Sequence, residues 1–190
     1  SRTLLNGKSL LAVQYNPFHI TLTHNFCDDI IKTGDSLNIK NAKIKDGNNA
    51  NRSSKVSWLE GENFPNHLHQ CIDSANKLYN FSLHEFEPAQ YTVYHEGDHY
   101  DWHIDNHKEP YHNGMIRKLS FTLCLNDEYE GGDFSICETH PISEKTKVKS
   151  FSLKKGEMIV FPSHTWHKVN KVTKGIRKAL VGWVVGKQWK

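Results

Sequence analysis

Residues 94–107 (YHEGDHYDWHIDNH) contain the densest cluster of histidines and acids in the sequence, and two metal-binding patterns compete within it. The first, at residues 95–99 (HEGDH), fits the H-E-x-x-H pattern, in which one helix carries two zinc ligands and a glutamate base. However, Gly97 lies inside that would-be helix, and the flanking residues have the aromatic and β-branched composition of strands. We therefore favour a glycine turn between two strands here. The alternative that remains open is a zinc metallohydrolase that uses His95, Glu96 and His99.

The second pattern is the H-x-D pair His103 and Asp105. On a strand, residues i and i+2 point to the same face, so an imidazole and a carboxylate would converge on one point. Non-haem Fe(II) sites need one more histidine and leave open positions for substrate and oxygen. His164 follows Pro-Ser and belongs to a turn, whereas His167 begins an alternating, strand-like segment. We therefore expect His103, Asp105 and His167 to be the metal ligands.

Arg177 lies ten residues after His167, across the turn signal at residues 172–175. A hairpin would bring the two side chains to one face of adjacent strands. A guanidinium that points into a protein interior is costly unless it meets an anion, and arginine forms bidentate pairs with carboxylates. The sequence thus predicts a carboxylate ligand beside the metal, with a protein acid such as Asp133 as the alternative partner. The residues expected to share the face of Arg177 are Ala179, Val181 and Trp183.

The elements that must position these residues are short strands in the second half of the chain. Turn signals separate segments rich in Val, Ile, Phe, Tyr, Trp and Thr, which favours a barrel or a double-sheet jelly roll. The eight expected strands lie near residues 89–95, 100–105, 117–125, 133–137, 148–153, 157–162, 166–172 and 176–185.

Two helices are expected before this β-rich part. Residues 25–36 predict a helix with Asn25 as its cap and Gly34 at its end. Helical spacing within residues 64–79 predicts a second helix, and residues 45–55 are polar enough to predict a loop. The apolar positions of the second helix are Leu68, Cys71, Ile72, Ala75 and Leu78. We expect one domain over residues 1–190, with 1–88 as a support region and 89–186 as the jelly-roll core.

Composition excludes several classes of protein. The 190 residues contain no apolar run of about 18 residues, which argues against a membrane span. The four cysteines form no C-x-x-C pair, and no signal-peptide pattern is visible, so a cytoplasmic location is expected. Residues 143–190 carry a net charge of +10 and residues 1–142 one of −7, yet no arginine-rich run or known motif supports nucleic-acid binding.

Five motifs in order resemble those of one enzyme superfamily. They are the run Tyr94-x-x-Gly97-x-x-Tyr100-x-x-His103-x-Asp105, residues 117–123 (RKLSFTL), residues 131–134 (GGDF), residues 155–162 (KGEMIVFP), and His167 with Arg177. Over residues 89–186 the chain resembles the Fe(II)- and 2-oxoglutarate-dependent dioxygenases, and within them the prolyl 4-hydroxylase-like and PKHD-type hydroxylases.

That resemblance implies a mainly β fold with flanking helices, a double-stranded β-helix buttressed by N-terminal helices. It implies that Fe(II) binds to His103, Asp105 and His167, and that Arg177 binds the distal carboxylate of 2-oxoglutarate. Side chains expected to line the cosubstrate pocket are Tyr94, Thr122, Cys124 and Trp183. Plausible substrate contacts are Arg117 and Trp102.

The implied reaction uses O2, with ascorbate as the reductant, to hydroxylate a C–H bond while 2-oxoglutarate becomes succinate and CO2. The prolyl-hydroxylase resemblance favours a proline in a peptide or protein as substrate. Besides the zinc hydrolase, a third hypothesis is a non-catalytic jelly-roll scaffold that only binds a carboxylate.

Overall fold

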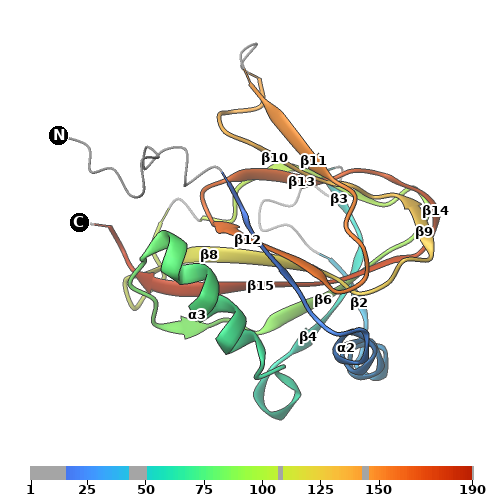
Figure 1. The fold of residues 1–190 in the computed structure, drawn as a ribbon, viewed down its shortest axis with the longest axis horizontal. Coiled ribbons are helices and arrows are strands. Elements are labelled where there is room, and N and C mark those ends of the chain that lie inside the picture. Colours follow the sequence, from blue (N-terminus) through green and yellow to red (C-terminus); the bar gives the residue numbers. More distant parts are fainter. Residues whose placement is uncertain (1–15, 43–50, 107–108, 143–145, 190) are drawn as a thin grey trace.

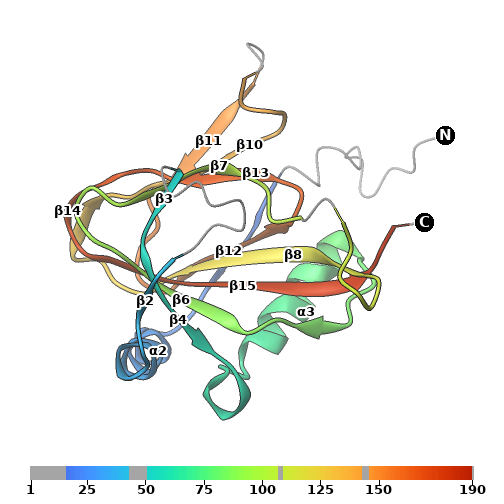
Figure 2. The same ribbon diagram turned by 180° about the vertical axis from the view of Figure 1, so that it is seen from behind.

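The computed structural model describes residues 16–42, 51–106, 109–142 and 146–189. Their strands form a large and a small sheet that lie face to face, with the helices on the outer side of the large sheet (Figure 1, Figure 2). This is the jelly-roll architecture with flanking helices that the sequence predicts, and the mainly β fold class is confirmed.

The large sheet has eight strands, and all of its pairings are antiparallel. In spatial order they are β1 (Phe18–Thr21), β12 (Glu157–Pro162), β8 (Met115–Cys124), β15 (Arg177–Lys187), β6 (Ala89–Tyr94), β4 (Lys55–Leu59) and β2 (Lys40–Asn41), with β5 (Glu85–Phe86) paired to β15. In this sheet β12, β8 and β15 from the second half of the sequence therefore lie between β1 and β6 from the first half.

The small sheet covers the inner face of the large one. Its spatial order is β11 (Val148–Phe151), β10 (Phe134–Cys137), β13 (Trp166–Val169), β7 (His99–His103) and β3 (Arg52–Ser53). A separate pair, β9 (Tyr129–Gly131) and β14 (Val172–Gly175), joins the two layers at one end, whereas the β10–β11 hairpin projects away from them (Figure 2). Each of the eight segments expected to be strands overlaps one, with ends that differ by up to two residues for most of them, and the segment near 166–172 contains all of β13 and the start of β14.

Helix α2 (His24–Ser36) occupies the position of the first expected helix but differs at both ends. Thr23, not Asn25, is the cap, since its side chain accepts a hydrogen bond from the backbone N–H of Phe26 at 3.2 Å. Gly34 does not end the helix. It is buried within the last turn, where a Cβ would lie 2.4 Å from the Tyr91 ring. The glycine is therefore needed for close packing of α2 on β6.

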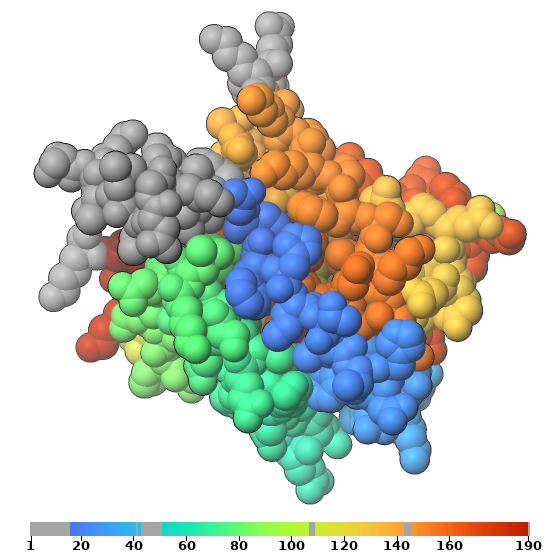
Figure 3. Space-filling view, in the orientation of Figure 1, coloured from blue at the N-terminus to red at the C-terminus, as the bar shows by residue number. Residues whose placement is uncertain are grey.

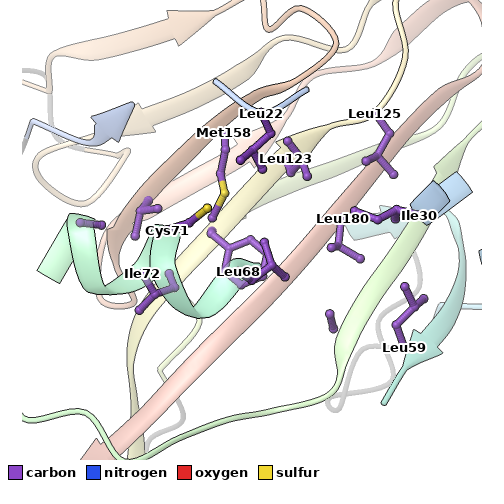
Figure 4. Packing of buried hydrophobic residues seen from close by; sticks show 14 of the residues in the cluster. Leu22, Ile30, Leu59, Leu68, Cys71, Ile72, Leu123, Leu125, Met158 and Leu180 are labelled. Carbon is purple, nitrogen blue, oxygen red and sulfur yellow. The ribbon is translucent and has the colours of Figure 1, made fainter. Parts of the chain in front are cut away.

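Helix α3 (Leu68–Tyr79) also packs on the large sheet, through the face that its apolar spacing predicts. Figure 4 shows Leu68 and Cys71 on the side of α3 nearest to Met158 and Leu123 of the sheet, and Ile72 belongs to the same buried cluster. One expectation was wrong at the end of this face: Leu78 is 38% exposed, and the next residue, Tyr79, is buried instead. In the space-filling view, α3, β1 and α2 lie together over this side of the molecule (Figure 3).

The expected loop at residues 45–55 lies mostly outside the described residues, but its end is not a loop. Residues 52–53 form β3 at the edge of the small sheet, and residue 55 begins β4 in the large one. The support region thus contributes strands to both layers: β1, β2, β4 and β5 to the large sheet and β3 to the small one. A second apolar cluster fills the space between the layers, and Tyr94, Cys124, Phe134 and Ile159 belong to it.

Candidate functional site

The structure brings His103, Asp105 and His167 together between the two sheets. His103 ends β7 and pairs in register with His167 of β13, while Asp105 follows β7 after one intervening residue. One ligand atom from each residue lies within 4.8 Å of the other two, and this is the one such group of three found among the described residues. The cluster predicted from the H-x-D pair therefore forms in space.

Both imidazoles are oriented by backbone carbonyl groups. Nδ1 of His103 is 2.7 Å from the carbonyl oxygen of Asp101, and Nδ1 of His167 is 2.8 Å from that of Thr165. A hydrogen on Nδ1 donated to a carbonyl leaves the lone pair on Nε2 free for a metal. These Nε2 atoms lie 3.6 Å (His103) and 3.4 Å (His167) from Oδ1 of Asp105, so all three donors face one point.

Asp105 is held at its other oxygen by a residue that the sequence analysis did not single out. The Ser120 hydroxyl donates to Oδ2 of Asp105 at 2.7 Å and lies 2.9 Å from the Ser163 hydroxyl. Burial alone would raise the pKa of Asp105, but the two facing imidazoles outweigh it and hold that pKa well below its usual range. Burial and the nearby His167 lower the pKa of His103 to about 3. At neutral pH Asp105 is thus a carboxylate and His103 a neutral imidazole, which are the forms of these side chains that bind metal.

An aromatic stack supports His103 from the side of β3. The Tyr100 ring lies on the His103 ring, with centroids 3.6 Å apart and planes 12° from parallel. The guanidinium of Arg52 also lies over the Tyr100 ring, 4.5 Å from its centroid. Arg52 is in turn fixed by hydrogen bonds to Ser54 (2.9 Å) and Gln90 (2.7 Å). Four residues from three strands and a connecting loop therefore restrict the position of one imidazole.

Arg177 begins β15 and is almost completely buried, with 1% of its surface exposed. Its Nε, Nη1 and Nη2 atoms have no hydrogen-bond partner within the described part of the chain. The alternative partner Asp133 does not fill this role: its backbone carbonyl accepts from Asn170, and it makes no bond to the guanidinium. A buried, unpartnered guanidinium is a site for an anion, because its donors otherwise remain unsatisfied.

The residues expected to line a pocket near Arg177 divide into two groups. Tyr94 is the register partner of Arg177, and its ring lies 5.4 Å from the guanidinium carbon. Thr122 and Cys124 are buried on the same face of β8 as Ser120, so they also face the space between the sheets. Trp183, by contrast, pairs with Ser120 and lies towards Asp105, at the other end of the site from Arg177.

Trp183 and Arg117 form one surface beside Asp105. The Arg117 guanidinium lies 3.9 Å from the Trp183 ring centroid and makes two bonds to Glu87, through Nε (2.6 Å) and Nη2 (3.0 Å). Tyr111 donates to the same carboxylate at 3.0 Å. The exposed ring of Trp58 extends this surface, with its centroid 6.2 Å from that of Trp183.

Two groups of residues singled out in the sequence, Trp102 and the H-E-x-x-H residues 95–99, lie outside this arrangement of ligands. The Trp102 ring lies 5.0 Å from Lys168 Nζ, and Lys168 alternates with His167, so Trp102 is on the opposite face of the small sheet. The H-E-x-x-H residues form no helix: β6 ends at Tyr94, Gly97 has a φ of 89°, and β7 begins at His99. The zinc-hydrolase alternative thus lacks the helix that its geometry needs.

The donors present fit a divalent iron ion with a carboxylate cosubstrate. Two Nε2 atoms and one carboxylate oxygen converge, which is the donor set of non-haem Fe(II), and Arg177 supplies an unpartnered cation in the same interlayer space. Such a site in a jelly roll defines the class of non-haem iron oxygenases. A family model described as the 2OG-Fe(II) oxygenase superfamily matches residues 89–185, just over half of the chain. The chain belongs to this superfamily.

Curated relatives are named PKHD-type hydroxylases. A PKHD-type hydroxylase of Synechococcus sp. (strain CC9311) is 45% identical over 87 residues, which are 45% of this chain and 36% of that protein. One from Prochlorococcus marinus is 34% identical over 146 residues, 75% of this chain and 60% of the relative. The chain therefore spans about half the length of the curated relatives that it matches.

Solved structures agree in fold. A prolyl-4-hydroxylase from Pseudomonas putida has a TM-score of 0.69 at 17% identity, covering 92% of this chain and 98% of that one. A Trichoplax adhaerens prolyl hydroxylase in complex with a peptide fragment of hypoxia inducible factor has a TM-score of 0.67 at 18% identity, covering 92% and 86%. Within the described residues, no helix is long and apolar enough to cross a membrane.

Proposed function

We propose that this chain is an Fe(II)- and 2-oxoglutarate-dependent dioxygenase that hydroxylates a prolyl residue in a peptide or protein. The observation that carries the proposal is the convergence of two Nε2 atoms and one carboxylate oxygen from His103, Asp105 and His167 within 4.8 Å. The unpartnered Arg177 supports 2-oxoglutarate as the cosubstrate, because a metal site alone would not require a buried cation.

In this proposal, His103, Asp105 and His167 hold Fe(II), and Arg177 binds the distal carboxylate of 2-oxoglutarate. When bound, Fe(II) supplies the oxidation by O2, which converts 2-oxoglutarate to succinate and CO2 and places one oxygen atom on the substrate carbon. The chain itself orients the groups: Ser120 fixes the carboxylate of Asp105, and the Tyr100 ring fixes the imidazole of His103. Ascorbate is the proposed reductant that keeps the iron in its ferrous state.

The chemistry of the surface beside Asp105 favours a substrate group that is uncharged and ring-shaped. Glu87 neutralises Arg117 through two hydrogen bonds, so this cation is not free to select an anionic substrate. The neighbouring rings of Trp183 and Trp58 offer aromatic faces, on which an apolar pyrrolidine ring packs well. Arg117 and Trp183 are therefore proposed substrate contacts, whereas Trp102 is not retained.

The reaction class is tested with two histidines of one strand. Purified protein with Fe(II), 2-oxoglutarate and ascorbate is expected to form succinate, and His103→Ala is expected to abolish both succinate formation and stoichiometric Fe(II) binding. His99→Ala, at the other end of β7, is expected to retain both. Loss of both in His99→Ala, with zinc bound in preference to iron, would favour the hydrolase. Absence of succinate with every peptide tried would favour the carboxylate-binding scaffold.

The substrate is tested separately by mass spectrometry of proline-containing peptides and candidate proteins. We expect the gain of one oxygen atom on proline, dependent on 2-oxoglutarate and lost in His103→Ala. The same gain on another residue or on a free metabolite would contradict the prolyl substrate while leaving the dioxygenase class intact.

A further inference from the structure

The buried surroundings of Arg177 contain a second polar group, which neither the motifs nor the metal site explains. Tyr129 lies in β9, on the two-stranded pair that joins the layers beside the start of β15. Its hydroxyl is 3.3 Å from Sγ of Cys124 and 3.3 Å from the backbone carbonyl oxygen of Leu153. Cys124 pairs with Ala179, which lies on the same face of β15 as Arg177.

Gly132 explains why Tyr129 and Arg177 approach each other. A Cβ at this position would lie 2.9 Å from Cδ of Arg177 and 3.3 Å from Cε2 of Tyr129, so both side chains flank the same glycine. Burial raises the pKa of the Tyr129 hydroxyl, while the positive charge of Arg177 acts in the opposite direction. The hydroxyl is therefore protonated at neutral pH and lies close enough to Arg177 to sense its charge.

The present partners of this hydroxyl hold it only weakly. Hydroxyl hydrogen bonds in proteins are usually about 2.7–2.8 Å long, and sulfur is a weak acceptor. Apart from its approach to Arg177, the Tyr129 hydroxyl has two contacts, both of 3.3 Å, and one of them is to sulfur. A carboxylate is a stronger acceptor than either, and it keeps free lone pairs after a bidentate bond to arginine.

We propose that Tyr129 donates its hydroxyl proton to the distal carboxylate of the 2-oxo acid that Arg177 binds. The inference rests on the proposed function, which supplies the identity of the anion. Tyr129 is then a direct contact for the cosubstrate, whereas the Cys124 thiol, a weak donor, packs beneath the hydroxyl. This arrangement depends on Gly132, because the absence of a side chain there allows the Tyr129 ring and the Arg177 side chain to lie close together.

The test is cosubstrate binding, measured by calorimetry on the full chain loaded with Mn(II), which supports no turnover. Tyr129→Phe is expected to raise the Kd for 2-oxoglutarate about 10- to 100-fold, the effect of a lost hydrogen bond to a charged group. Its Kd for 2-oxobutanoate, which has the same oxo-acid end but no distal carboxylate, is expected to equal that of the wild type.

Tyr91→Phe is the matched control. It removes another tyrosine hydroxyl, which donates to Asp35 at 2.6 Å on the outer side of the large sheet. This variant is expected to bind 2-oxoglutarate as the wild type does. If Tyr129→Phe also binds 2-oxoglutarate normally and only loses stability, the hydroxyl is merely structural and the inference is overturned.

Arg177→Met separates this inference from the proposed function. Should the wild type fail to bind 2-oxoglutarate, or Arg177→Met bind it normally, the function itself fails and the inference with it. Should Arg177→Met lose binding while Tyr129→Phe keeps it, only the role of Tyr129 fails. If Tyr129→Phe does not fold, 3-fluorotyrosine at position 129 gives the same answer: its fluorine resonance is expected to shift with 2-oxoglutarate and not with 2-oxobutanoate, and equal spectra overturn the inference.

Discussion

Ser120 shows how a single hydroxyl sets the geometry of the site. Its bond to Oδ2 of Asp105 leaves Oδ1 facing the two imidazoles, so the carboxylate presents one defined oxygen. Removal of such a supporting bond commonly weakens metal binding without changing the ligands themselves.

We therefore expect Ser120→Ala to weaken metal binding by roughly 10- to 100-fold while the protein stays folded. Competition between the protein and a chelator for Mn(II) measures the effect. Ser150→Ala is the control, since Ser150 bonds to Ser135 in the small sheet, away from the ligands. Equal metal affinity of Ser120→Ala and the wild type would contradict the role assigned to this hydroxyl.

Arg177 leads to an unusual prediction about stability. Buried donors without partners cost about 1–3 kcal/mol, so Arg177→Met is expected to raise the free energy of unfolding of the ligand-free protein by about that amount. In the presence of Mn(II), 2-oxoglutarate at 100 times its Kd is expected to stabilise the wild type by about 2.7 kcal/mol and the variant hardly at all. Urea denaturation with and without 2-oxoglutarate measures both effects.

Arg117→Met is the matched comparison, because this arginine is paired. Its removal leaves Glu87 without its ionic partner, so the free energy of unfolding is expected to fall. If both arginine variants change the free energy of unfolding in the same direction, the contrast between an unpartnered Arg177 and a paired Arg117 is contradicted.

The ligands could be predicted from sequence because their spacing is local. His103 and Asp105 lie two residues apart, at the end of β7 and just beyond it, and His167 follows a recognisable Pro-Ser turn. Ser120 and Glu87 were missed because each acts through a partner distant in the sequence, Asp105 and Arg117 respectively. The sequence did contain a signal for Ser120. It lies two residues before Thr122 on the same expected strand, so its side chain is on the face that Thr122 was expected to present to the site.

At the scale of elements, close packing depends on Gly34. The helix end predicted at this glycine was wrong because the missing side chain serves packing against Tyr91, not termination. Likewise, the expected loop near residue 52 proved to contain β3, whose Arg52 supports Tyr100. Local composition could not reveal either contact, since both depend on strands that lie far apart in the sequence.

We expect Gly34→Ala to lower the free energy of unfolding by about 1–2 kcal/mol. Alanine favours a helix by about 1 kcal/mol over glycine, but overpacking a core commonly costs about 1–3 kcal/mol. Here the new Cβ would lie 2.4 Å from the Tyr91 ring, so the steric cost outweighs the gain. Lys32→Ala on the exposed side of α2 is the control, and a stabilised Gly34→Ala would contradict this packing.

At the scale of the whole molecule, we propose that residues 1–190 form one domain. The support region supplies β1, β2, β4 and β5 to the large sheet, β3 to the small sheet, and the helices α2 and α3 that pack on the large sheet. A core of residues 89–186 alone would expose the apolar face that α2 and α3 cover.

A chain of residues 89–190 is therefore expected not to fold cooperatively, whereas a chain of residues 16–190 is expected to fold. Circular dichroism melting and binding of a hydrophobic dye distinguish the two results. Cooperative melting of residues 89–190, together with 2-oxoglutarate binding, would show that the core is independent of the support region.

The position of β15 also constrains how a nascent chain acquires this structure. This strand comes last in the sequence, yet it lies between β8 and β6 at the centre of the large sheet. Until Arg177–Lys187 has left the ribosome, the sheet edges of β6 and β8 have no partner there, so the jelly roll can close only after synthesis of this strand. Translation that stops earlier therefore leaves an unclosed sheet with unpaired strand edges, which is prone to aggregate. The same truncated chain also lacks Arg177, because Arg177 begins the strand that completes the sheet.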